Sequence, residues 1–131
     1  MRHPTILIAD DDSRLLEALS QRLRNDGFEV VTATDGYNAL AKAVECAPDV
    51  MILDVNMPAG DGFTVLERGH NRAELSDTPV IYLTGDKSTR LDEIADVLGA
   101  YATIHKPFDY DRLLNTIRAA LLSAPTPPSV A

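Results

Sequence analysis

Short apolar runs alternate along this chain with segments whose apolar residues recur at helical spacing. The runs, each four to six residues long, are Thr5–Ala9, Phe28–Ala33, Val50–Leu53, Val80–Leu83 and Ala102–His105. After each run, apolar side chains recur three or four residues apart, as Leu16, Leu19 and Leu23 do. Strands alternating with helices are joined by crossovers that make the strands parallel, and such a sheet is buried on both faces. The pattern therefore predicts an α/β fold around a parallel sheet of five strands.

The size of the chain suits one such domain. It has 131 residues and a mass of 14.2 kDa, with 45% hydrophobic and 24% charged residues. This composition is neither that of a disordered chain nor that of a membrane protein, and no apolar run approaches the ~20 residues that a spanning helix needs. We predict a single domain over residues 1–122, followed at 123–131 by a proline-rich tail or linker stub, "SAPTPPSVA".

The composition also bears on location and partners. The apolar run near the N-terminus is too short for a signal peptide. A single cysteine, Cys46, cannot form an internal disulfide, which agrees with a reducing compartment. We therefore expect a cytoplasmic protein. The formal net charge of −8 repels phosphate backbones, so we expect no direct binding of nucleic acid, and no membrane contact.

Capping residues mark the ends of the predicted helices. Ser13 is predicted to cap the first helix and Gly27 to end it, whereas Asp35 caps the second and Pro48 follows it. The third helical segment, 63–75, is interrupted by a glycine, so we expect a short helix there.

Polar side chains follow four of the five predicted strands. In chain order they are Asp10 to Asp12, Asp54, Thr84 and Lys106. Parallel strands end at the same edge of a sheet, and ligands of such folds bind in the crevice there. We therefore expect these side chains to form one site.

The chemistry of this predicted site favours a phosphoryl group and a hard cation. Carboxylates gathered in one crevice repel each other unless a cation joins them, and oxygen ligands suit Mg²⁺ better than Zn²⁺. Lys106 and Thr84 offer a positive charge and a hydroxyl to phosphoryl oxygens. An aspartate can attack phosphorus, and Asp54 is central. Its alternative interpretation is a turn or helix-cap residue, since Asn, Pro and Gly residues follow it.

Four motifs of the chain match one family. They are "ILIADDD" at 6–12, "PDVMILDVNMPAGDG" at 48–62, "VIYLTG" at 80–85 and "HKPF" at 105–108. With these motifs, from about residue 5 to 122, the chain resembles the receiver domains of two-component response regulators, the CheY-like superfamily. The resemblance implies a flavodoxin-like (βα)5 fold with strand order 2-1-3-4-5. It also implies that Asp54 accepts a phosphoryl group from a sensor histidine kinase or a histidine phosphotransfer protein, in a Mg²⁺-dependent reaction that Mn²⁺ could also support.

The same resemblance assigns roles to individual residues. Asp10 and Asp11 match the acidic pair that binds the metal, with Asp11 the more direct ligand. Asn56 matches the residue whose backbone carbonyl binds the ion. Thr84 matches the switch hydroxyl, and Lys106 matches the phosphate-binding lysine.

Further positions are expected to modulate the reaction. Gly85 leaves room for the phosphoryl group, and Asn56 and Asp86 flank the path of the attacking water, so that they set how long the phosphoryl group persists. The chain departs from the family at Thr103, where an aromatic residue is usual. Tyr101 is two residues away, which would place it on the same face of a strand. Which of the two takes the place of the switch aromatic stays open.

The predicted function is a signalling switch rather than an enzyme with a separate substrate. Phosphorylation adds charge and acceptor oxygens at the site, and the output surface is expected on the fourth helix, fifth strand and fifth helix. A downstream target, an output domain or a second copy in a phosphorylation-dependent homodimer would bind there. The chain could instead be the receiver part of a longer regulator continuing past residue 131. A phosphatase of the haloacid-dehalogenase type is a remote alternative, because that class has an acid where Asn56 stands; a flavin-binding module is weaker still.

Overall fold

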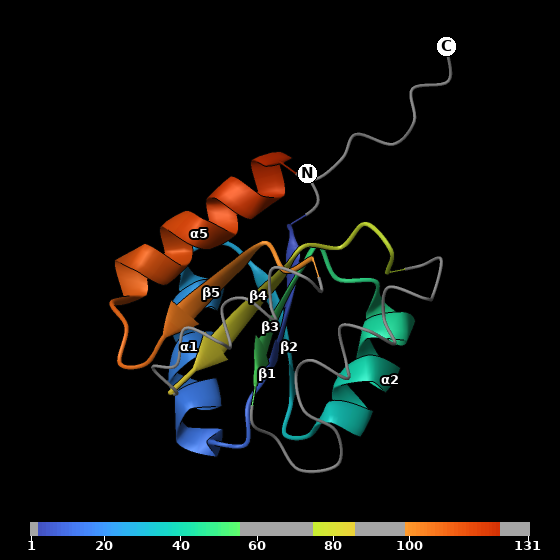
Figure 1. The fold of residues 1–131 in the computed structure, drawn as a ribbon, viewed down its shortest axis with the longest axis horizontal. Coiled ribbons are helices and arrows are strands. Elements are labelled where there is room, and N and C mark those ends of the chain that lie inside the picture. Colours follow the sequence, from blue (N-terminus) through green and yellow to red (C-terminus); the bar gives the residue numbers. More distant parts are fainter. Residues whose placement is uncertain (1–2, 56–74, 86–98, 124–131) are drawn as a thin grey trace.

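The computed structural model describes residues 3–55, 75–85 and 99–123 (Figure 1). Its strands are β1 (Thr5–Ala9), β2 (Glu29–Ala33), β3 (Val50–Asp54), β4 (Val80–Thr84) and β5 (Ala102–His105). Its helices are α1 (Ser13–Asn25), α2 (Gly36–Cys46) and α5 (Tyr110–Ser123). All five strand predictions are confirmed to within one residue at either end. The predicted third and fourth helices fall almost wholly outside the described residues.

The strands form one parallel sheet in the order β2-β1-β3-β4-β5, which confirms the expected flavodoxin-like order. β1 lies beside β3. The helix that follows β1 (α1) and the helix that precedes β3 (α2) lie on opposite faces of the sheet. In a doubly wound sheet the crevice for ligands opens at the point where the strand order reverses. That point is the carboxyl edge between β1 and β3.

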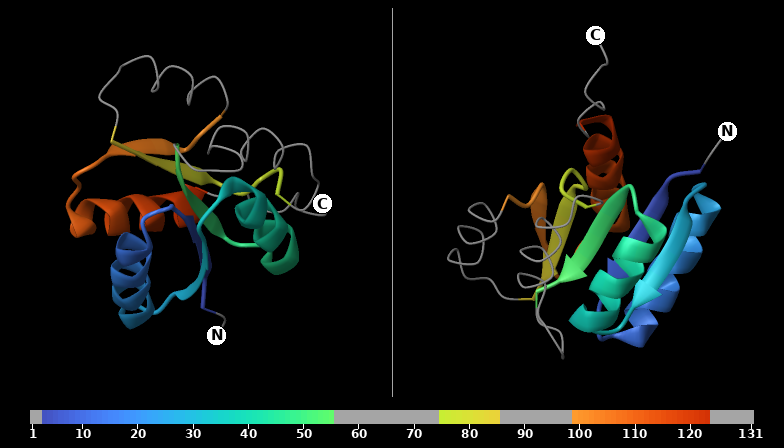
Figure 2. Two further views of the ribbon diagram at one scale, coloured as in Figure 1. Left: turned by 90° about the horizontal axis from the view of Figure 1, so that it is seen from below. Right: turned by 90° about the vertical axis from the view of Figure 1, so that its right-hand side faces the viewer.

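Two hydrophobic clusters sandwich the sheet. In β1, Ile6 and Ile8 pack in the cluster that includes α1 and α5, whereas Leu7 and Ala9 pack in the cluster on the side of α2. Figure 2 shows α1 and α5 covering one face and α2 the other. Because successive side chains of a strand point to opposite faces, both sets are buried, and β1, β3 and β4 are buried throughout. Tyr82 in β4 is fully buried.

The cap of α1 is Asp12 rather than Ser13, so that prediction is wrong. The Asp12 carboxylate accepts hydrogen bonds from the backbone N–H groups of Arg14 (3.1 Å) and Leu15 (3.2 Å), which makes Ser13 the first helical residue. A carboxylate also complements the positive end of the helix dipole better than a hydroxyl does. Gly27 follows the helix with φ +95°, a conformation that favours glycine.

Removal of this cap should lower stability measurably. Asp12→Ala leaves the first-turn N–H groups without their acceptor, and we expect the free energy of unfolding to fall by about 1 kcal/mol in a urea titration. Ser13→Ala is the matched control, and its expected change is within about 0.5 kcal/mol. Equal losses in the two variants would restore Ser13 as a contributor to the cap.

The end of α5 meets the predicted tail. The helix runs through Ser123, the first residue of the range predicted as tail, and the Ser123 hydroxyl donates to the carbonyl of Ala120. The remainder of that range, 124–131, lies outside the described residues. Among the helices that the structure describes, none is long and apolar enough to cross a membrane.

Candidate functional site

The predicted site residues lie together at the carboxyl edge of the sheet. Asp10 directly follows β1, Asp54 ends β3, Thr84 ends β4 and Lys106 directly follows β5. Thr84 is fully buried, and its carbonyl accepts a 2.7 Å hydrogen bond from the backbone N–H of Lys106. That bond continues the β4–β5 pairing one residue past the end of β5 and fixes the position of the Lys106 backbone.

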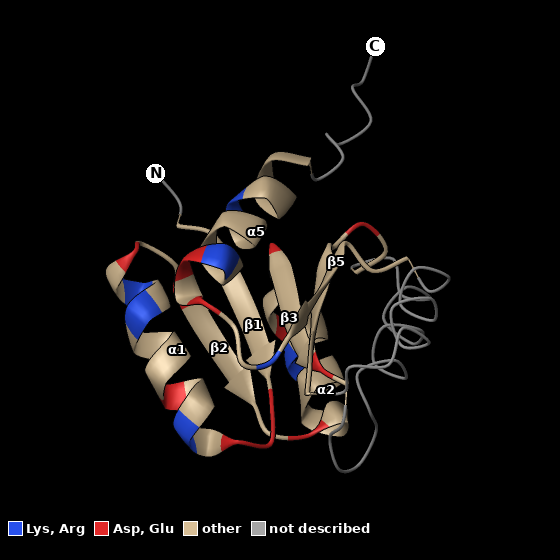
Figure 3. Cartoon of the chain, turned by 60° about the vertical axis from the view of Figure 1, so that its left-hand side comes forward, with Lys and Arg blue, Asp and Glu red and all other residues tan. Residues whose placement is uncertain are grey.

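Three carboxylates form a tight cluster at this edge. One oxygen each of Asp10, Asp11 and Asp54 lies within 4.8 Å of the other two. Asp10 is fully buried and Asp54 is 6% exposed, whereas Asp11 opens to solvent. Figure 3 shows the acidic segment that follows β1 close to the basic segment that follows β5. Two buried carboxylates side by side require a compensating positive charge.

Lys106 supplies a positive charge to both buried carboxylates. Its Nζ lies 2.7 Å from Oδ2 of Asp10 and 3.5 Å from Oδ2 of Asp54. Burial by itself would lower the pKa of Lys106, but the hydrogen bond to Asp10 and the charges of Asp10 and Asp54 outweigh it and raise the pKa above its usual value. The ammonium therefore stays charged at neutral pH, and its shorter contact is to Asp10.

The contact between Lys106 and Asp10 was not predicted from the sequence, which placed the lysine on the phosphoryl side only. Oδ1 of Asp10 accepts a 2.9 Å hydrogen bond from the backbone N–H of Asp12. Each oxygen of Asp10 thus has a partner, one from the lysine and one from the start of α1. No sequence motif signals this pairing, because 96 residues separate the two side chains.

The cluster has the donor set of a site for a hard cation. It offers carboxylate oxygens within mutual reach, and Asp11 provides a solvent-open side through which an ion with bound waters can enter. Oxygen donors of this kind suit Mg²⁺ or Mn²⁺. The residues present therefore fit an acidic triad of the type that holds Mg²⁺ in receiver domains.

Several other predicted positions are only partly described. Asn56 and Asp86 lie outside the described residues. Gly85 follows β4, and a Cβ added to it would meet no described atom within 4 Å. Thr103 lies in β5 opposite Tyr82, half-buried. Tyr101 directly precedes β5, outside the predicted and observed strand, and is 40% exposed.

An open groove adjoins the acidic cluster. Its volume is about 420 Å³, and it lies between α1 and the segment that joins β5 to α5. Apolar side chains form much of its lining, namely Leu15, Ala18, Leu19, Pro107 and Phe108. Asp12 and Lys106 line it too, so the groove reaches the site. The Lys106–Pro107 bond is cis.

Comparison with known proteins gives consistent results. The model of the response regulator receiver domain family matches residues 6–118. The chain is 41% identical over 119 residues to the transcriptional regulatory protein PrrA of Mycobacterium tuberculosis, a match that covers 90% of this chain and 50% of PrrA. It is 37% identical over 123 residues to the DNA-binding dual master transcriptional regulator RpaA of Synechocystis, which covers 90% of this chain and 49% of RpaA. The chain thus spans about half the length of these curated relatives.

Solved structures show the same fold. The chemotaxis response regulator CheY4 of Vibrio cholerae matches with a TM-score of 0.85 and 34% identity over 91% of this chain and 99% of CheY4. A CheY-like receiver domain protein of Methanospirillum hungatei matches with a TM-score of 0.88 and 29% identity over 94% of this chain and 97% of that one. In both cases nearly the whole of the solved chain is covered.

The fold and the acidic pocket of Asp10, Asp11 and Asp54 define a phosphoacceptor domain rather than an enzyme that turns over a separate substrate. Within that class, the chain belongs to the response regulator receiver domain family of two-component signalling. Receiver domains of this family partner with histidine kinases.

Proposed function

We propose that Asp54 accepts the phosphoryl group and that Lys106 and Thr84 assist the transfer. The observation that carries the proposal is the cluster of three carboxylates with one ammonium held against its two buried members. Asp54 ends the central strand β3, and Asp10 and Lys106 lie on either side of it in the order of the sheet. An acceptor in this place has cation ligands beside it and a fixed positive charge close by.

The transfer follows from this arrangement. One carboxylate oxygen of Asp54 forms a bond to phosphorus while the P–N bond to the donor imidazole breaks, and the electron pair of that bond leaves with the imidazole nitrogen. Negative charge is then spread over the equatorial phosphoryl oxygens. The ammonium of Lys106, 3.5 Å from Asp54, is placed to stabilise that charge, with the Thr84 hydroxyl as a further donor. A bound Mg²⁺, held by Asp10, Asp11, Asp54 and the Asn56 carbonyl, would neutralise the carboxylates and coordinate phosphoryl oxygens.

The proposal is tested with a small phosphodonor. We expect the wild-type chain, incubated with acetyl phosphate and Mg²⁺, to gain one phosphoryl group by intact mass, mapped by peptide mass spectrometry to Asp54. Chelation of the divalent ion with EDTA should prevent the gain. An adduct that maps elsewhere, or none at all with Mg²⁺ present, contradicts the proposal.

The groove beside the site gives the donor protein a place to dock. It is largely apolar, and it leads from the surface of α1 to Lys106 and Asp12 at the edge of the site. We infer that a helix of the kinase or phosphotransfer protein lies there while its phosphohistidine reaches Asp54. A small donor needs no such surface.

A negative charge introduced into the groove should therefore slow transfer from a protein donor but not from a small-molecule donor. Ala18 is exposed on α1 and lines the groove, so Ala18→Glu adds a carboxylate there without opening the core. We expect transfer from a phosphohistidine-bearing kinase domain to slow roughly tenfold or more, at the scale of ~1.4 kcal/mol or more in docking, with the rate from acetyl phosphate unchanged. Ala41→Glu, exposed on α2, is the control. Equal transfer in the two variants would rule out docking at this groove.

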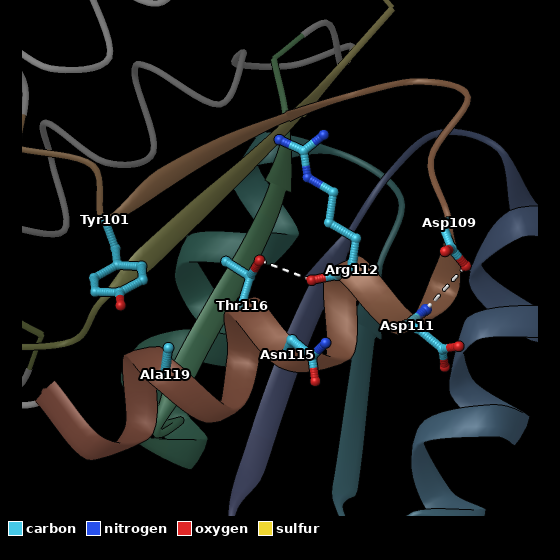
Figure 4. Close-up of a pocket in the computed structure, with 7 residues that line it drawn as sticks. All are labelled: Tyr101, Asp109, Asp111, Arg112, Asn115, Thr116 and Ala119. Carbon is cyan, nitrogen blue, oxygen red and sulfur yellow. Dashed lines mark hydrogen bonds between the residues drawn. The ribbon is translucent and has the colours of Figure 1, made fainter.

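The output surface is proposed at a second pocket on α5, distinct from the groove beside α1. A shallow pocket of about 560 Å³ lies there, between Tyr101 and the face of α5 that carries Arg112, Thr116 and Ala119 (Figure 4). In the close-up, Tyr101 lies beside this helix. A shift of β5 that follows phosphorylation would alter this surface. A downstream target, an output domain beyond residue 131 or a second copy is proposed to bind there, together with the fourth helix, which lies outside the described residues.

A further inference from the structure

Tyr110, the first residue of α5, is attached to the end of α1. Its hydroxyl donates a 2.7 Å hydrogen bond to Oδ2 of Asp26, and the guanidinium carbon of Arg22 lies 3.8 Å from the centre of its ring. Tyr110 is only 8% exposed. Desolvation, together with the hydrogen bond to and charge of Asp26, raises the pKa of Tyr110 to about 12, so the hydroxyl keeps its proton at neutral pH. A buried phenol with its donor bound and a cation over its ring is a fixed attachment point.

The other end of α1 is attached to the acidic cluster. Asp12 caps the helix, and its backbone N–H donates to Oδ1 of Asp10 at 2.9 Å. The helix therefore has one end bound to a carboxylate of the site and the other end bound to Tyr110. Because the helix connects the two attachments, a change in the seating of α1 moves both of them relative to the sheet.

Lys106 lies in the segment that leads from the end of β5 to Tyr110. Its backbone is held by the carbonyl of Thr84, and three residues separate it from Tyr110. Its ammonium must lie within reach of Asp10 and Asp54 together, at 2.7 and 3.5 Å. Because the lysine side chain is flexible, the placement of the segment 106–109 affects how closely its ammonium approaches each carboxylate.

We propose that Tyr110 is a positioning residue for Lys106: its bond to Asp26 holds the segment 106–109 against α1 and so keeps the ammonium between Asp10 and Asp54. The inference rests on the proposed function, in which Lys106 stabilises the incoming phosphoryl group. Tyr110→Phe removes only the hydroxyl and leaves the ring under Arg22, which makes it the sharpest variant for this purpose.

A double-mutant cycle tests the proposal. We expect Tyr110→Phe to slow phosphorylation of Asp54 by acetyl phosphate and Mg²⁺ roughly tenfold, the scale of a small misplacement of a catalytic group. In a Lys106→Met background the same change should leave the rate unaltered, because Tyr110 acts through the lysine. Tyr37→Phe is the matched control, since Tyr37 is 73% exposed on α2 and should be silent in both backgrounds. Equal slowing in the two backgrounds, or no slowing with Lys106 present, overturns the proposal.

Chemical labelling gives a second readout that does not depend on phosphorylation. We expect the Lys106 amine to react several-fold faster with acetic anhydride in Tyr110→Phe than in Tyr37→Phe, as measured by peptide mass spectrometry. Unchanged reactivity overturns the positioning role even if the variant is less stable. A wild-type chain that gains no phosphoryl group defeats the proposed function instead, while labelling still reports whether Tyr110 holds Lys106.

Discussion

Asp54→Asn is expected to abolish the phosphoryl adduct completely. The amide keeps the size and shape of the carboxylate at the end of β3, but its oxygen is a far weaker nucleophile and carries no negative charge towards the cation site. Intact mass after incubation with acetyl phosphate and Mg²⁺ should therefore match the untreated variant, while the wild type gains its adduct. The measurement is a yes-or-no comparison on the same instrument.

The matched control for this variant directly precedes the same strand. Asp49 precedes β3 at the opposite edge of the sheet, where its Oδ2 accepts a 2.7 Å hydrogen bond from the backbone N–H of Thr5. Asp49→Asn keeps an acceptor there, so we expect a folded chain with a normal adduct. An adduct of wild-type size on Asp54→Asn would show that another side chain is the acceptor, with Asp11, the exposed member of the cluster, as the first to be checked.

Lys106→Met should lower stability most strongly when no divalent ion is present. The substitution leaves Asp10, which is fully buried, without its 2.7 Å partner and places no positive charge beside Asp54. Breaking a buried pair costs several kcal/mol, and the lysine is 27% exposed, so we expect a loss of about 2 kcal/mol in the free energy of unfolding. Saturating Mg²⁺ should recover part of that loss, because the ion binds the folded cluster.

The pH dependence of this difference follows from the raised pKa of Lys106. A group whose pKa is raised on folding contributes stability below its unfolded pKa, and that contribution disappears as the pH rises through the folded value. The ordinary pKa of the side chain is 10.5. The gap between wild type and Lys106→Met should therefore be constant near neutral pH and shrink above that value. Urea titrations across this range measure it.

Lys42→Met provides the comparison for these titrations. Lys42 donates a 2.6 Å hydrogen bond to the carbonyl of Thr32 at an exposed strand edge and faces no buried carboxylate in the described part of the chain. Its loss should cost less than about 1 kcal/mol and should not respond to Mg²⁺. A loss at Lys106 that Mg²⁺ does not reduce would argue against binding of the ion at the acidic cluster.

The sheet could be predicted well because its signals are local. Each strand is a short apolar run, and runs such as Val50 to Leu53 are uniform because a parallel sheet is buried on both faces. The strand ends then placed Asp10, Asp54 and Lys106 at one edge by topology alone, and the structure brings them together there. The cap of α1 was misassigned because Asp12 and Ser13 are both good capping residues, and only the backbone conformation selects one.

The sequence alone therefore determined the fold class, the edge at which the site lies and the residue types available for its chemistry, since the periodicity that predicts alternating strands and helices depends on neighbouring residues. The order of the strands was implied only by the family resemblance. Tertiary structure decided which charges meet. Lys106 binds Asp10 more closely than Asp54, and Tyr110 bonds to Asp26 across 84 residues. Such contacts depend on where whole helices pack, and the distances that set them, of a few ångströms, have no counterpart in the spacing of residues along a chain.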